Sequence, residues 1–138
     1  MPAGKVLVLV GSDSDRPVME GGLEVLMRSG IDVRFEVSSA HRDPRGTIDL
    51  ASGAASRGFS VIICGAGLSA ALPGMVAAHT DLPVIGVPIA AGTLGGMDAL
   101  LSTVQMPPGV PVATVGINNS KNAAHLAVRI LRLARVPA

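Results

Sequence analysis

Short apolar runs alternate along the chain with segments of helical periodicity. Five runs have the length of a β-strand: 5–10, 33–37, 60–66, 83–88 and 110–116. The segments between and after them place apolar residues near the i, i+3, i+4 spacing of an amphipathic helix, over 16–29, 44–57, 72–79, 97–105 and 122–133. This alternation predicts one α/β domain spanning residues 1–138.

Several of the strand-length runs are apolar throughout, as in KVLVLV (5–10). Such strands are typical of a parallel sheet that helices cover on both faces. Right-handed crossovers then favour a flavodoxin-like, doubly wound parallel sheet of five strands in a three-layer sandwich. Asp15, and Asp43 with Pro44, predict the starts of the first two helices, and Gly30 and Gly58 predict their ends.

Clusters of small and polar residues follow the first four predicted strands. They are GSDSD (11–15), SSAHR (38–42), GAGLSAALPG (65–74) and PIAAGTLGG (88–96). Because sheets of this kind bind ligands at the carboxyl ends of their strands, we expect these four loops to build one site.

The composition narrows the class of protein. Apolar residues make up 49% of the chain and charged residues 15%, against about 25% charged in an ordinary soluble domain. We therefore expect part of the apolar surface to be buried against other copies of the chain. No apolar stretch is long enough to span a membrane, and no secretory leader is present, so we expect a cytoplasmic protein. A net charge of +1, no cationic block and only two aromatic residues, Phe35 and Phe59, argue against nucleic-acid binding.

Metal and cofactor motifs give little signal. The chain has no HxxxH, CxxC or clustered carboxylates, and its one cysteine, Cys64, ends an apolar run as a small buried residue does. GAGLSA fits the dinucleotide pattern GxGxxA. However, it follows the third predicted strand, and the next strand ends without the acidic residue that would hold a ribose hydroxyl. We expect neither a metal nor a nucleotide cofactor.

The GSDSD loop and the SSAHR loop hold the residues best suited to chemistry. Hydroxyls, a glycine and a helix start suit a phosphate or ribose, although a turn with a helix cap explains GSDSD equally well. Imidazole is the side chain suited to taking and returning a proton near neutral pH, so His41 is the candidate proton carrier, and Arg42 offers a planar fork for phosphate. A histidine that only caps a helix or bonds a nearby loop is the alternative. His79 and His125 lie in predicted helices and are expected to have no catalytic role.

Four motifs in fixed order carry a resemblance to a known family: GSDSD, SSAHRDP, GAG…LPGM and STVQMPPGVPVATVGI. Over about residues 6–131 the chain resembles the aminoimidazole ribonucleotide carboxylase-related family of purine biosynthesis. Bacterial members of this family are N5-carboxyaminoimidazole ribonucleotide mutases, called PurE. The resemblance implies a single PurE-like domain, a flavodoxin-like fold, a homo-octamer and no cofactor.

The resemblance also implies roles for seven residues. His41 is then the catalytic proton carrier. The implied substrate-binding residues are Ser12, Ser14, Asp15, Ser39, Arg42 and Gly67, of which the GSDSD loop and Arg42 hold the phosphorylated ribose.

The implied partners are a ribonucleotide and carbon dioxide. Carbon dioxide leaves the exocyclic nitrogen of a carbamate, stays trapped, and is attacked by an electron-rich ring carbon, from which His41 then takes a proton. A small dry pocket favours recapture over escape, and Ala40, Gly65 and Ala66 leave room for it.

The third loop departs from the family pattern. Bacterial mutases usually read GAGGAAHLPG, whereas this chain reads GAGLSAALPG, with Leu68 and Ser69 in place of small residues and Ala71 in place of a histidine. Animal-type carboxylases, which use free carbon dioxide, also lack this histidine but usually carry SAHK. Arg42 and LPGM favour the mutase. A carboxylase using free carbon dioxide on aminoimidazole ribonucleotide or a pyridine nucleotide, and a non-catalytic nucleotide-binding module, are the alternatives.

Overall fold

A computed structural model describes residues 4–134. Strands and helices alternate from β1 to α5, with one short 3-10 helix before α1 and another before α4. The elements are β1 (Lys5–Val10), η1 (Asp13–Asp15), α1 (Arg16–Arg28), β2 (Asp32–Val37), α2 (Pro44–Gly53), β3 (Val61–Gly67), α3 (Leu72–Ala78), β4 (Val84–Ile89), η2 (Gly92–Leu94), α4 (Met97–Val104), β5 (Ala113–Thr114) and α5 (Ser120–Leu133).

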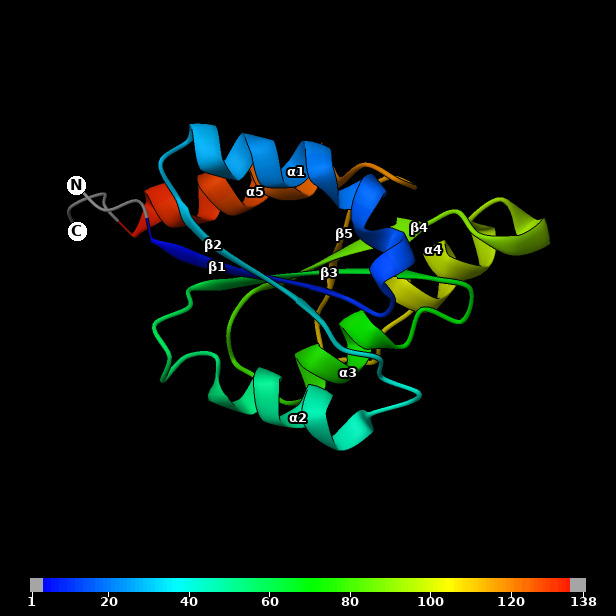
Figure 1. Cartoon of the computed structure of the whole chain (residues 1–138). Helices are drawn as coiled ribbons and strands as arrows, with labels where there is room; N and C mark the ends of the chain where they lie inside the picture. The colour runs from blue at the N-terminus through cyan, green and yellow to red at the C-terminus, as the bar shows by residue number, and fades with distance from the viewer. Residues whose placement is uncertain (1–3, 135–138) are drawn as a thin grey trace.

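The five strands form one parallel sheet in the order β2-β1-β3-β4-β5. Helices α1 and α5 cover one face, and α2 and α3 cover the other (Figure 1). Helix α4 packs on the second face through Ala99, beside β4. This is the predicted flavodoxin-like, doubly wound three-layer sandwich. Among the described residues, no helix is both long and apolar enough to cross a membrane.

The strands in the middle of the sheet are buried on both sides, as their unbroken apolar sequence requires. Along β1, Val6, Val8 and Val10 face the α1–α5 side, and Leu7 and Leu9 face the α2–α3 side. All five are at most 1% exposed. Fully burying a side chain of this size contributes about 1.5–3 kcal/mol, so the two cores hold the sheet between its helical layers.

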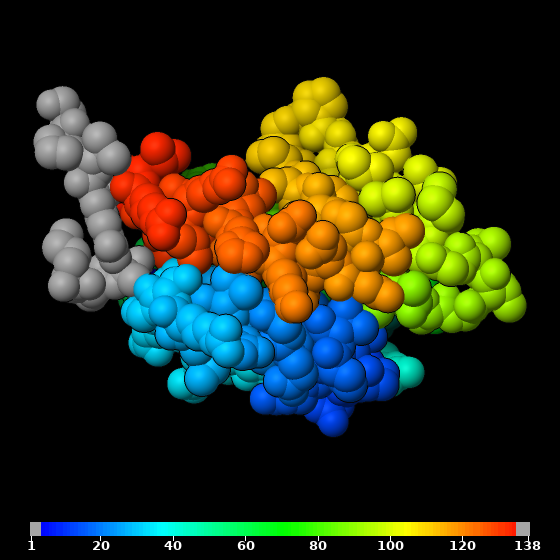
Figure 2. Space-filling view, turned by 90° about the horizontal axis from the view of Figure 1, so that it is seen from above, coloured from blue at the N-terminus to red at the C-terminus, as the bar shows by residue number. Residues whose placement is uncertain are grey.

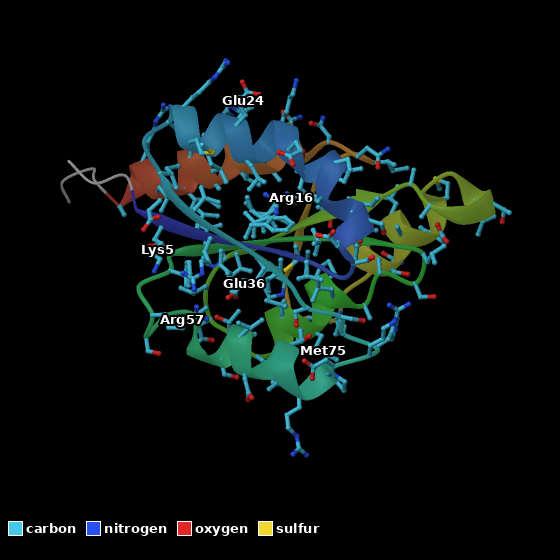
Figure 3. All side chains as sticks on the ribbon, in the orientation of Figure 1. Lys5, Arg16, Glu24, Glu36, Arg57 and Met75 are labelled. Carbon is cyan, nitrogen blue, oxygen red and sulfur yellow. The ribbon has the colours of Figure 1, made fainter. Side chains whose placement is uncertain are left out.

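Strand β2, at one edge of the sheet, is half-exposed and carries more charge than the inner strands, on which Lys5 is the one charged residue. Glu36 lies 3.7 Å from the Arg34 guanidinium and 3.9 Å from that of Arg57. Lys5 Nζ lies 4.3 Å from the centre of the Phe59 ring, and Figure 3 shows Lys5, Glu36 and Arg57 near one another on this side. A charged edge strand discourages pairing with another sheet.

All the predicted strands and helices are present, but two are clearly shorter than the sequence pattern suggested. The fifth strand, expected over 110–116, has only two paired residues, Ala113 and Thr114. Pro111 has no backbone N–H to donate, so it cannot extend the ladder. The second helix, expected to run to residue 57, ends at Gly53 and continues as turns until Gly58, whose φ of 90° is left-handed. The predicted cap at Asp43 is confirmed, because its Oδ1 accepts from the Gly46 N–H at 3.1 Å.

Helices α1 and α5 lie side by side across the sheet (Figure 2). Their close approach depends on Ser120, the first residue of α5. Its hydroxyl donates to the Val18 carbonyl at 2.6 Å and accepts from the Gly22 N–H at 3.2 Å. A Cβ added at Gly22 would lie 2.6 Å from the Ser120 carbonyl oxygen. No side chain fits there unless the two helices separate.

Replacing Gly22 with alanine is expected to destabilise the fold by about 1–2 kcal/mol. The helical preference of alanine contributes about 0.5–1 kcal/mol, but overpacking against backbone costs about 1–3 kcal/mol and outweighs it. Gly53→Ala is the matched control, because a Cβ there meets no atom within 4 Å; its free energy of unfolding should stay unchanged or rise. Urea denaturation measures both, and equal effects at the two positions would refute the packing argument.

Candidate functional site

A pocket of about 330 Å³ opens at the carboxyl ends of the strands. The four polar loops predicted from the sequence build it together. It is lined by Gly11, Ser12, Ser14, Asp15, Ser39, Ala40, His41, Arg42, Ala66, Gly67, Leu68, Ala70, Ala71, Leu72 and Ala91. All seven residues proposed from the sequence therefore lie around one cavity; their roles remain predictions.

The GSDSD loop forms a compact hydroxyl cluster after β1. Ser12 caps η1, with its Oγ 2.9 Å from Ser14 Oγ and 3.3 Å from Ser14 N. The Asp15 N–H donates to the Ser12 carbonyl at 3.0 Å. Asp15 stands at the N-cap of α1, as predicted, but its carboxylate makes no capping hydrogen bond to the helix. It lines the pocket instead.

Burial raises the pKa of Asp15 above its usual value, and a hydrogen bond with the Ser12 backbone partly offsets this effect. Partial burial makes the ionised carboxylate costly unless donors surround it. The hydroxyls of a sugar are suitable donors, so Asp15 is poised to accept from a polyol rather than to bind an anion.

The SSAHRDP turn is fixed from both sides and presents His41 and Arg42 outward. Ser38 is buried, with its hydroxyl 2.6 Å from Thr47 Oγ1 in α2. Ser39 Oγ accepts from the Arg42 N–H at 3.1 Å, and the Ser39 carbonyl accepts from the Asp43 N–H at 2.8 Å. His41 and Arg42 themselves are exposed at the pocket. Among residues 4–134, the His41 side chain makes no hydrogen bond to a helix end or to a nearby loop, so the structure gives no support to the alternative of a capping or loop-bonding histidine.

The end of β3 and the residues that close β4 approach each other closely at residue 67, so a side chain there would be tightly packed. A Cβ at Gly67 would lie 3.2 Å from both Ala91 Cβ and the Ile89 carbonyl oxygen. The pocket wall here consists of small residues, among which Ala71 adds no polar group. This wall leaves space for a flat ligand but offers it no side-chain hydrogen-bond donor.

Asn118 supports the segment that carries the pocket residue Ala91, although the sequence analysis did not identify it. Its backbone is left-handed, with φ of 61°. Its N–H donates to the Pro88 carbonyl at 2.8 Å, and its Oδ1 accepts from the Ala90 N–H at 2.9 Å. Asparagine tolerates the left-handed region, and the Asn-Asn pair before the last helix was the available signal. Asn118 thereby fixes Ala90, next to the pocket residue Ala91.

The remaining titratable candidates lie elsewhere. His79 Nδ1 lies 2.8 Å from the Met75 carbonyl at the end of α3, and His125 is exposed on α5. Cys64 is buried, and burial raises the pKa of its thiol far above the usual range. Within residues 4–134, no three His, Cys, Asp or Glu side chains gather where they could hold a metal ion.

The family model described as AIR carboxylase matches residues 5–136. The chain belongs to the AIR carboxylase family. A solved structure titled as PurE from Treponema denticola agrees with this assignment. It superposes with a TM-score of 0.84 at 31% identity, over 94% of this chain and 80% of that one.

Relatives in this family carry two names. Proteins named N5-carboxyaminoimidazole ribonucleotide mutase from Thermotoga maritima and Mycobacterium tuberculosis are each 56% identical. The matches cover 92% and 96% of this chain, and 74% and 78% of those proteins. A chloroplastic phosphoribosylaminoimidazole carboxylase from Vigna aconitifolia is 55% identical over 91% of this chain, which spans 23% of that longer protein.

Asn118 variants should separate backbone strain from hydrogen bonding in the pocket wall. We expect Asn118→Ala to lower the free energy of unfolding most, since a left-handed alanine costs about 1–2 kcal/mol and the lost bond to Ala90 about 0.5–1.5 kcal/mol. Asn118→Gly should lose only the second contribution, and Asn118→Asp should lose least because it keeps the acceptor. Chemical denaturation gives the order, and a glycine variant as unstable as the alanine variant would contradict it.

Proposed function

We propose that this protein is an N5-carboxyaminoimidazole ribonucleotide mutase. It converts the carbamate of aminoimidazole ribonucleotide into 4-carboxyaminoimidazole ribonucleotide, in purine biosynthesis and in the cytoplasm. Family membership and the identity to mutase-named proteins support the proposal. The observation that carries it is the placement of His41, Arg42 and the GSDSD hydroxyls around one cavity of suitable size.

The polar side of the pocket binds the phosphorylated ribose. The paired hydroxyls of Ser12 and Ser14 donate to phosphate oxygens, and the Arg42 guanidinium supplies the charge and a planar fork. Asp15 accepts from the sugar hydroxyls, as its partial burial favours. Ser39 holds the turn that carries Arg42 through the bond to its N–H.

The apolar side of the pocket receives the aminoimidazole ring. Gly67, Ala66 and Ala70 are too small to displace the ring. Holding the ring and carbon dioxide in contact turns a bimolecular capture into an intramolecular one.

A single imidazole can both supply the proton that the reaction needs and take back the proton that it releases. The C–N bond of the carbamate breaks, its electron pair stays on nitrogen, and His41 gives that nitrogen a proton. The ring carbon then forms a bond to the released carbon dioxide, and His41 takes the proton from that carbon. One proton is given and one is taken, so His41 ends as it began.

A direct carboxylase is the second candidate, favoured by Ala71 and by the similarity to carboxylase-named proteins. It would use aminoimidazole ribonucleotide and free carbon dioxide in the same pocket. The two reactions share their second half and differ in the source of carbon dioxide.

Initial rates with each substrate test the proposal. We expect the carbamate to give product much faster than aminoimidazole ribonucleotide with bicarbonate at physiological concentration. Equal efficiency would replace the mutase by the carboxylase. If neither substrate gives product but the protein still binds the ribonucleotide, the protein is a non-catalytic nucleotide-binding module.

His41→Asn is expected to lower turnover by about 10²–10⁴-fold, the usual contribution of a positioned acid–base group. Binding of aminoimidazole ribonucleotide, measured by calorimetry, should change little, because the phosphate side of the pocket is intact. His79→Asn is the matched control, since His79 lies outside the pocket; it should keep full activity. Normal turnover in His41→Asn would refute the assignment of the proton carrier.

We also propose that the protein assembles as a homo-octamer, with α4 at an interface between copies. Met97, Leu101 and Val104 are 50%, 54% and 46% exposed and lie on one side of α4, while Ala99 and Thr103 on its other side are buried. Leu94, just before α4, is 60% exposed. An apolar helix face of this kind is typical of a protein–protein contact.

Leu101→Asp should dissociate the assembly into smaller species, because an unpaired charge is costly to bury at an interface. Analytical ultracentrifugation measures the change. Met27→Asp is the control, since Met27 is 69% exposed near the end of α1, away from α4. An assembly of unchanged size in Leu101→Asp would exclude α4 from the interface.

A further inference from the structure

Leu68 lies in the pocket wall with a backbone conformation that leucine rarely adopts. Its φ is 54°, and within residues 4–134 only Asn118 shares a positive φ among non-glycine residues. Asn118 gains two hydrogen bonds in return. A leucine has no polar group to compensate the steric cost of this region. Such strain concentrates at functional positions.

The Leu68 side chain is also more exposed than a leucine of the fold needs to be. It is 53% exposed, whereas Leu72, the other leucine of the pocket, is 2% exposed. Neither core of the sheet includes Leu68. Neither the backbone conformation of Leu68 nor the burial of its side chain therefore stabilises the fold. The presence of a leucine at this position needs another reason.

The position of Leu68 follows from its contact with the neighbouring loop. A Cβ added at Gly92, in the turn after β4, would lie 2.9 Å from Leu68 Cδ2. The missing side chain at Gly92 leaves the space that this methyl group uses. Leu68 thus extends from the β3–α3 loop toward the β4–η2 loop, along the rim of the pocket.

The walls around the reacting end are otherwise built from small residues. Ala66, Gly67, Ala70, Ala71 and Ala91 line it, and none of them can cover a ligand. Leu68 is the large apolar side chain that is both exposed and at this wall. It is placed to cover a ring bound beside His41.

We propose that Leu68 is an apolar gate that retains carbon dioxide between its release and its recapture. The proposal rests on the mutase function and deepens it. Carbon dioxide is small and uncharged, so it is held by excluding water and closing its exit rather than by a charged group. Escape leaves aminoimidazole ribonucleotide and free carbon dioxide, which water converts to bicarbonate and a proton.

Isotope exchange in a single turnover measures escape directly. Enzyme in excess converts unlabelled carbamate in buffer containing ¹³C-bicarbonate, with carbonic anhydrase present to equilibrate free carbon dioxide. Retained carbon dioxide gives unlabelled product. Escape and recapture from solution place the label in the product carboxylate, after subtraction of the exchange in an enzyme-free sample.

Four substitutions separate a gate from a backbone effect. A gate requires an apolar side chain of this length, so Leu68→Ala, Leu68→Gly and Leu68→Asn should raise the labelled fraction several-fold, and Leu68→Met should match the unmodified protein. Glycine and asparagine tolerate a positive φ, and alanine and methionine do not. A role confined to backbone strain would instead group glycine with asparagine, and alanine with methionine.

Three results would overturn the gate. The first is a labelled fraction as low in Leu68→Ala as in the unmodified protein. The second is a grouping of the four variants by their tolerance of a positive φ. The third is a loss of the native assembly in Leu68→Ala that accounts for its higher labelled fraction. Met27→Ala, remote from the pocket, should leave the labelled fraction unchanged. If the unmodified protein forms no product from the carbamate, the mutase function fails; if it forms unlabelled product and the Leu68 variants do too, only the gate fails.

Discussion

The parallel register of strands β2, β1, β3 and β4 sets the geometry of the site. Val10, the last residue of β1, is level with Val37 at the end of β2 and with Gly65 near the end of β3. Gly67, the last residue of β3, is in turn level with Ile89 at the end of β4. The loops after β1 and β2 therefore leave the sheet at one level, and the loops after β3 and β4 leave it two residues further along. A slip of two residues in any pair would move a loop by about 6.6 Å, which exceeds the reach of a hydrogen bond.

The pocket is divided by the chemistry of the loops that this register brings together. Hydroxyls, a carboxylate and a guanidinium come from the loops after β1 and β2. Small apolar residues come from the loops after β3 and β4, where Gly67 and Ala91 nearly touch. A ligand with a charged, hydroxyl-rich end and a flat, neutral end matches this division. A ribonucleotide with a small heterocycle has both ends, so under the proposed function the charge distribution of the pocket would set its orientation.

The fold and the polar half of the site were predictable because their determinants are local. Unbroken apolar runs such as KVLVLV require two covered faces, and the motifs at strand ends must meet if the sheet is parallel. The length of β5 depended on Pro111. Asp15 stands at the predicted N-cap, but its carboxylate faces the pocket and makes no capping hydrogen bond. The apolar wall was less predictable. Leu68 with Gly92, and Asn118 with Ala90, join segments far apart in the sequence, and no local pattern reports such contacts.

Ala71 limits how the proton can move in this site. A pocket with two imidazoles can give a proton to the carbamate nitrogen from one ring and take the carbon proton with the other. Among residues 4–134, His41 is the one histidine that lines this pocket. Position 71, where a second histidine was expected, is an alanine with only a methyl side chain. Under the proposed function one ring must therefore serve both steps in turn, first as acid and then as base. In that sequence carbon dioxide is free from the breaking of the carbamate C–N bond until the ring carbon captures it, and the apolar gate proposed at Leu68 acts in this interval.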